Sequence, residues 1–191
     1  EHLGDVKSFS LNLEARYREI KERRTMVVTP EESFFTVTQE CSAPPHVVWE
    51  WMMELGKREL YMHGTRWTSG TRPEGRTGVG ATNHCAHGSG VSLETFLDWK
   101  PFDYSTTESV FGPFRMWMTD RLEATPTGTR VRCYSRLMNP WPKWIAKPFF
   151  RFMMKMNKIE QNYRMMAQLA GESYARQSAS SAPVSQPVVS A

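Results

Sequence analysis

The last third of the chain carries the strongest hydrophobic pattern. Between residues 139 and 177, large apolar residues recur at steps of three and four, which is the spacing of one face of an α-helix. The members of this stripe are Trp141, Trp144, Ile145, Phe149, Phe152, Met153, Met156, Ile159, Tyr163, Met166 and Leu169. Asn139-Pro140 supplies a cap and a first-turn proline, so the pattern predicts one long helix with a kink at Pro148. A helix with so wide an apolar face must cover a large apolar surface elsewhere.

The segments before this helix are short, rich in aromatic and β-branched residues, and separated by turn residues, which is typical of strands. They are residues 33–42, 65–69, 79–87, 91–99, 104–111, 114–124 and 129–137. Ser42-Ala43-Pro44-Pro45 starts a short helix after the first of them, and Gly56 ends or interrupts that helix. Short connections between the later strands predict an antiparallel meander. The expected fold class is therefore α+β, with a curved antiparallel sheet wrapped around the long C-terminal helix.

The two ends of the chain differ from this central pattern. Residues 1–30 contain a mixed-charge helical run and are interpreted as an N-terminal helical extension, either the end of a preceding domain or a helix packed loosely on this one. From residue 178 to 191 the sequence lacks charge and helical periodicity, which predicts a disordered tail. The central domain is accordingly expected to span residues 31–177.

Composition narrows the class of protein. A hydrophobic fraction of 40% and a charged fraction of 23% are ordinary for a globular domain of 191 residues. A net charge of +4 is too small to indicate a dedicated nucleic-acid binder, so no nucleic-acid partner is expected. The cysteines Cys41, Cys85 and Cys133 are odd in number and scattered, which favours a reducing compartment and hence a cytoplasmic location. No apolar run in the sequence reaches the length of a membrane span.

Several local motifs occur in a shared order. The first combines a strand with a proline-started helix and spans residues 35–51, FTVTQECSAPPHVVWEW. The second, GVGA at 78–81, precedes a strand, and the third, LETFLDWKP at 93–101, ends one. The fourth, TGTRV at 127–131, enters the last strand. Together these segments resemble the START-like (SRPBCC) superfamily, in particular its polyketide cyclase/dehydrase branch, over roughly residues 33–172. The resemblance implies a helix-grip fold in which the sheet and the last helix enclose a deep apolar cavity.

Three functions follow from this resemblance as alternatives. The first is binding or transport of a small hydrophobic ligand, such as a lipid, a quinone or a polyketide-like molecule. The second is an enzyme of the polyketide cyclase/dehydrase type. The third is a regulatory or membrane-surface module, because residues 4–24 resemble the end of a small domain that precedes START-like domains in some bacterial proteins related to adenylate cyclases.

Nine residues are candidates for the cavity lining. The polar or amphipathic strand residues are His84, Glu94, Tyr104, Trp117, Arg132 and Tyr134, and the helix contributes Phe149, Met153 and Met156. Strand alternation places His84 on the same face as Thr82, and Glu94 on the face opposite Leu93. Both faces of the sheet carry apolar residues, so the sequence does not decide which face points inward. Methionines are flexible and suit a pocket of variable shape.

A metal site and a catalytic site receive less support. In His84-Cys85-Ala86-His87, neighbouring side chains of a strand point to opposite faces, and zinc usually needs three or four protein ligands, so neither a metal nor a cofactor is expected. In the cyclase alternative, His84 could act as base with Tyr134 or Arg132 as donor. No phosphate loop, nucleophile elbow or paired-carboxylate motif is present in the sequence, and catalytic residues stay unassigned.

The segment PWPKWIAKPFFRF, residues 140–152, mixes aromatic residues with cations. Such a composition can lie at a bilayer interface. It can equally form the start of the long helix, with the lysine stems lying along apolar surface. The second interpretation is favoured because an interfacial helix would leave the sheet uncovered. A membrane surface is thus a less favoured partner, and the oligomeric state stays open.

Overall fold

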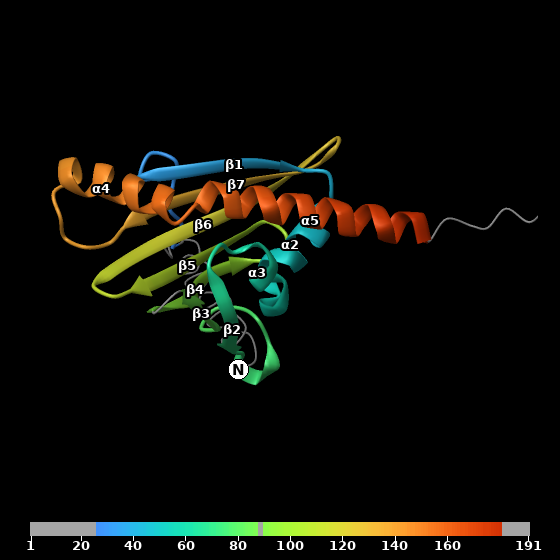
Figure 1. Cartoon of the computed structure of the whole chain (residues 1–191). Coiled ribbons are helices and arrows are strands. Elements are labelled where there is room, and N and C mark those ends of the chain that lie inside the picture. Colours follow the sequence, from blue (N-terminus) through green and yellow to red (C-terminus); the bar gives the residue numbers. More distant parts are fainter. Residues whose placement is uncertain (1–25, 88–89, 181–191) are drawn as a thin grey trace, which may run out of the picture.

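The body of the protein is one antiparallel sheet (Figure 1). The computed structural model describes residues 26–87 and 90–180, and within these ranges the sheet has seven strands in the order β1-β7-β6-β5-β4-β3-β2. The strands are β1 (Phe35–Cys41), β2 (Thr65–Thr71), β3 (Thr82–His87), β4 (Gly90–Lys100), β5 (Tyr104–Phe111), β6 (Phe114–Thr125) and β7 (Gly128–Leu137). Strands β2 to β7 form a meander, and the last strand, β7, pairs with the first, β1. The expected order of elements is confirmed.

Helices lie at two points of the chain. Between β1 and β2 come α2 (Pro45–Met53) and α3 (Leu55–Tyr61), and β2 is followed by a short 3₁₀ turn, Pro73–Gly75. After β7 come α4 (Lys143–Met156) and α5 (Ile159–Ser180). Figure 1 shows α5 crossing the sheet beside α2 and α3, with its last turns extending beyond the strands. Because α5 packs on β1, α2 and α3, the fold is the helix-grip arrangement that the sequence predicts.

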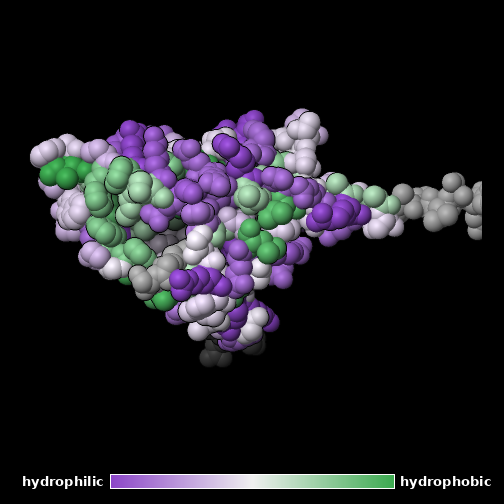
Figure 2. All heavy atoms as spheres, in the orientation of Figure 1, coloured by the Kyte–Doolittle hydropathy of each residue, from purple (hydrophilic) through white to green (hydrophobic). Residues whose placement is uncertain are grey.

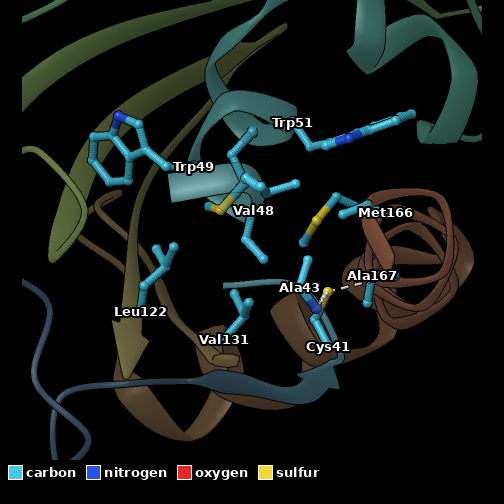
Figure 3. Packing of buried hydrophobic residues seen from close by; sticks show 12 residues of the cluster. Cys41, Ala43, Val48, Trp49, Trp51, Leu122, Val131, Met166 and Ala167 are labelled. Atoms are coloured by element: carbon cyan, nitrogen blue, oxygen red, sulfur yellow. Dashed lines mark hydrogen bonds between the residues drawn. The ribbon is translucent and has the colours of Figure 1, made fainter. Parts of the chain in front are cut away.

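The first part of the core joins α2 and α5 to the sheet. Figure 3 shows Val48 and Trp49 of α2 facing Leu122 and Val131 of the sheet, with Met166 of α5 nearby. On the same side, the Cys41 thiol donates a hydrogen bond to the carbonyl oxygen of Ala167 at 3.2 Å. A second part of the core lies under α4, whose buried residues are Ala146, Phe150 and Met154. These residues pack against β1 and the end of β7, so both C-terminal helices cover the same face of the sheet.

The long C-terminal helix of the predicted fold is present as α5, but its predicted extent is wrong, because the segment 139–177 forms two helices, α4 and α5. The break lies at Asn157-Lys158, where Lys158 adopts a left-handed φ of 52°. Asn157 stabilises this end of α4, since its backbone N–H and its side-chain amide both donate to the carbonyl oxygen of Met153, at 3.1 and 2.9 Å. The helix α4 continues through Pro148, where a kink was predicted. The proline lies on an exposed side of α4, where water can reach the backbone carbonyl that it leaves without a helical partner.

The expectations for the two ends concern mostly residues outside the described ranges. The mixed-charge helical run before residue 26 and the tail after residue 180 both lie there. Residues 178–180, which were assigned to the tail, are the last residues of α5. Val28 is buried, and its backbone N–H donates to Thr119 Oγ1 at 2.8 Å, so this part of the chain covers the outer face of the sheet.

Candidate ligand-binding cavity

A cavity of about 170 Å³ lies between the inner face of the sheet and the helices. Strands β4, β5 and β6 form its floor, the ends of α2 and α3 form one wall, and the junction of α4 with α5 forms the other. Eight methionines line it: Met52, Met53, Met62, Met116, Met118, Met153, Met154 and Met166. Because methionine side chains adapt to different shapes, the cavity can adjust to the outline of a ligand.

Strand alternation determines which side chains reach this cavity. On β4 the lining residues are Ser92, Glu94 and Phe96, while Leu93 between them is exposed on the other face. On β6 the lining residues are Met118 and Asp120, with Met116 before them. The inward face of the sheet, which the sequence leaves open, is therefore the face that carries Glu94 and Asp120.

One polar group of the cavity is an ion pair between helix and sheet. Arg58 Nη2 lies 2.7 Å from Glu94 Oε2, and the two side chains are only 12% and 11% exposed. Glu94 also accepts a hydrogen bond from the side-chain amide of Asn83 at 3.3 Å, and Asn83 in turn accepts one from Arg72 at 2.9 Å. Burial opposes the charge on Arg58, but the Glu94 carboxylate raises the Arg58 pKa, so the guanidinium stays charged.

A second polar group joins α5 to the centre of the sheet. The Tyr163 hydroxyl donates a hydrogen bond to Asp120 Oδ1. Asp120 also lines the cavity. Burial raises the Asp120 pKa to about 6, although the hydrogen bond from Tyr163 lowers it. Cys133 is the cross-strand neighbour of Asp120, and burial, together with the nearby carboxyl group, raises the pKa of the Cys133 thiol. Asp120 can therefore exchange a proton near neutral pH.

Two of the nine residues proposed from the sequence line the cavity, namely Glu94 and Met153. The others lie elsewhere. His84 is on the outer face of β3, where its Nε2 is 3.4 Å from Thr82 Oγ1. Tyr104 donates to Asp98 at 3.3 Å beside Arg121, which lies 5.8 Å from the tyrosine ring.

The remaining five residues also lie away from the cavity. The Trp117 indole N–H donates to Glu108 at 2.8 Å, and Arg132 pairs with Glu123 at 3.1 Å, both on the outer face. Tyr134 is buried on that outer face as well. Phe149 packs against Phe114 and Trp141, with ring centroids 5.4 Å apart in each case, and Met156 is largely exposed. The three strand residues lie outside because strand alternation points them to the outer face, and the two residues of α4 lie outside because their side of the helix does not face the cavity.

Three important residues were not proposed from the sequence, namely Arg58, Asp120 and Tyr163. For Asp120 a signal exists, because it continues the alternating set Phe114, Met116, Met118, where a carboxyl group among apolar residues is unusual. Tyr163 belongs to the apolar stripe of the C-terminal segment and was read as packing. Arg58 lies among other charged residues of α3 and has no distinguishing pattern.

Comparison with known proteins agrees with this geometry. Residues 34–171 match the model of the family described as polyketide cyclase / dehydrase and lipid transport. The match covers most of the chain, so the protein belongs to this family, and with it to the START-like (SRPBCC) superfamily. No curated protein matches the chain.

Solved structures with the same fold are distant in sequence. Protein MLL2253 from Mesorhizobium loti is 20% identical, with a TM-score of 0.56 over 71% of this chain and 94% of that one. Ara h 8.0201 is 11% identical, with a TM-score of 0.57 over 71% of this chain and 95% of that one. A protein of unknown function from Staphylococcus aureus, SA2116, is 10% identical, with a TM-score of 0.57 over 75% and 95% of the two chains. At these identities the likeness establishes the fold.

Two general properties complete the description. Within residues 26–87 and 90–180, no helix combines the length and apolar character that crossing a membrane requires. Among those same residues, no three histidine, cysteine, aspartate or glutamate side chains lie close enough together to share a metal ion.

Proposed function

We propose that the protein binds a small, mainly apolar molecule in the cavity beneath α5. The observation that carries this proposal is the composition of the cavity. Its lining is rich in methionine and contains two polar pairs, Arg58-Glu94 and Asp120-Tyr163. Ligand sites are commonly apolar spaces with a few polar groups that orient the ligand. Membership of a family that includes lipid-transport proteins supports the same function.

The size of the cavity narrows the ligand class. Small-molecule pockets usually measure about 300–1,000 Å³, whereas an apolar cavity of about 150 Å³ accommodates benzene. At about 170 Å³ the cavity fits a single ring or a short branched chain without rearrangement. Larger lipids or polyketide-like molecules require the methionine side chains to move, which their flexible rotamers allow.

The polar groups indicate how such a ligand is oriented. Within the described part of the chain, Arg58 Nε is buried without a hydrogen-bond partner, although the same guanidinium is paired to Glu94 through Nη2. An unsatisfied buried donor costs free energy, which a carbonyl or hydroxyl oxygen of the ligand would recover. We therefore favour ligands with an apolar body and one oxygen acceptor, such as quinones or aromatic ketones.

The test is a thermal-shift titration of delipidated protein with fatty acids, quinones and polyketide-like aromatics. A ligand at 100 times its Kd stabilises the native state by about 2.7 kcal/mol, which raises Tm by roughly 5–10 °C for a domain of this size. Ser109→Phe should block the cavity and abolish the shift. Val110→Phe, at the next residue on the outer face, is the matched control and should retain it. The absence of a shift across the whole panel would contradict the proposal.

A second function, catalysis of the cyclase/dehydrase type, is supported by Asp120. Such a reaction needs a base near a carbonyl compound, and a carboxyl group with a pKa of about 6 in an apolar cavity is suited to that role. His84, the base suggested from the sequence, does not line the cavity. Asp120→Asn should then abolish turnover of a β-polyketone substrate while leaving its binding intact. Unchanged turnover would exclude Asp120 as the base and leave the binding function in place.

A further inference from the structure

The outer side of α4 is not used by the cavity or by the core. Ala146, Phe150 and Met154 face the sheet, and the opposite side of the helix is exposed. Trp144 is 78% exposed, Phe152 63% and Met156 64%. Large apolar side chains exposed together on one side of a helix indicate a surface with a partner. Figure 2 shows apolar and hydrophilic atoms gathered side by side at the end of the molecule where α4 lies.

The charges on α4 indicate the nature of this partner. A row of cations, Lys143, Lys147, Arg151 and Lys155, runs at steps of four beside a row formed by Trp144, Pro148 and Phe152. The helix carries no acidic residue between Lys143 and Met156. Arg151 also donates from Nε to the carbonyl oxygen of Phe34 at 2.8 Å, which fixes its position without neutralising its charge.

We propose that this side of α4 docks on an anionic phospholipid bilayer. Aromatic side chains beside a row of basic residues are the pattern of helices that lie in the membrane interface, where the apolar side chains insert and the cations meet the headgroups. A helix of 14 residues, about 21 Å long, presents both rows to a flat surface at once. The surface lies apart from the cavity lining, so this inference does not depend on the proposed ligand.

A second copy of the chain fits this surface less well. A two-fold interface through α4 would bring the same cations of both copies together, since the same patch faces itself. Like charges held at such close range are repulsive. Self-association through this face is therefore the alternative outcome of the test below.

The experiment is co-sedimentation of the full 191-residue chain with vesicles of phosphatidylcholine, with and without about one third phosphatidylglycerol, at low and high salt. We expect binding to the anionic vesicles that weakens as salt rises, and little binding to phosphatidylcholine alone. Each basic residue near an anionic surface contributes about fivefold in affinity, so Lys143→Gln with Lys147→Gln should lose about 30-fold. Trp144→Ala with Phe152→Ala should lose about tenfold or more.

Matched controls lie at the far edge of the sheet. Arg66→Gln with Arg76→Gln removes the same net charge from other exposed positions, and Trp67→Ala removes an exposed tryptophan from β2. Both controls should bind like the wild type. The proposal is overturned if the wild type does not sediment with anionic vesicles, if neutral vesicles bind it equally, or if the control pair loses as much affinity as the α4 pair. Light scattering that shows a dimer lost in Trp144→Ala with Phe152→Ala would also overturn it, in favour of self-association.

Discussion

Removing the carboxyl group of Asp120 should stabilise the folded protein at neutral pH. The ordinary pKa of an aspartate is 3.8, whereas burial raises that of Asp120 to about 6 in the folded state. Between about pH 4 and pH 6, the unfolded chain has released this proton and the folded chain still holds it, so stability falls as pH rises through that window. A difference of about 2 in pKa corresponds to roughly 3 kcal/mol. The contribution of the protonated group is fully present below about pH 4 and lost above about pH 6.

The variant Asp120→Asn has no such proton, so its stability relative to the wild type should increase by about 3 kcal/mol between pH 4 and pH 7. Urea denaturation followed by circular dichroism measures this difference at each pH. With an m-value of about 2 kcal/mol per M, the gap between the two urea midpoints should widen by roughly 1.5 M. Any loss of the Tyr163 hydrogen bond shifts the variant by the same amount at every pH and does not alter this change.

Two further variants test whether the pH dependence comes from the Asp120 carboxyl group. Gln161→Ala, at an exposed position of α5 that carries no titratable group, should show no widening over this pH range. Tyr163→Phe removes a hydrogen bond that favours the charged carboxylate, so the fall in stability should move to higher pH. A difference between Asp120→Asn and the wild type that stays constant from pH 4 to pH 7 would show that Asp120 is not buried in the way the structure describes.

Three stability predictions concern one cavity residue and two positions that hold the fold together elsewhere. Arg58→Met should lower the free energy of unfolding by about 3–5 kcal/mol in urea denaturation, because it leaves Glu94 buried without its cation. A loss below about 1 kcal/mol would contradict the burial of this ion pair. Phe150→Ala should cost about 3–5 kcal/mol, whereas Phe152→Ala, two residues away on the exposed side of α4, should cost less than about 1 kcal/mol; equal costs would contradict the described orientation of α4. Gly128→Ala should destabilise by roughly 2–4 kcal/mol in thermal unfolding, since Gly128 has a φ of 144° and a Cβ atom would lie 2.1 Å from the Cys41 carbonyl oxygen; an unchanged Tm would show that this turn can relax.

The sequence predicted the sheet well because its signals are local. Turn residues separate the strands at regular distances, and the proline-started helix after β1 lies where the capping pattern places it. The inward face could not be chosen, because the outer face is also partly buried. Thr106 and Thr119 are fully buried there and hydrogen-bonded to each other at 2.8 Å, and Val28 lies against Thr119. A sheet covered on both sides loses the contrast on which alternation depends.

The break between α4 and α5 was missed for a different reason. The apolar spacing continues across Asn157-Lys158, because both helices cover the same side of the sheet. The spacing of apolar residues therefore indicates which side faces the sheet, but it does not indicate whether the helix is continuous. The left-handed position that ends α4 gave no warning either, because it holds Lys158 and not the glycine or asparagine that usually occupies such a position.

The polar groups of the cavity were beyond local patterns altogether. The ion pair joins residues 36 positions apart, and the Tyr163-Asp120 hydrogen bond joins residues 43 positions apart. Arg58 lies among charged neighbours that favour a solvated helix, and only its tertiary partner, Glu94, makes its burial tolerable. Such pairs are determined by the packing of α3 and α5 on the sheet, which no window of the sequence contains.

The two proposals meet at the end of α4. Met153 and Met154 line the cavity, while Phe152 and Met156 lie on the exposed side proposed to dock on a bilayer. The left-handed residue Lys158 interrupts the helix directly after these positions, so α4 is joined to α5 through a short break and not through a continuous rod. The core beneath α4, with Phe150 and Met154, is accordingly separate from the core around Val48 and Met166 that holds α5. Docking of α4 would then place apolar membrane next to the wall of the cavity that is built from flexible methionine side chains, which is the position from which a ligand drawn from the bilayer could reach Arg58 and Asp120.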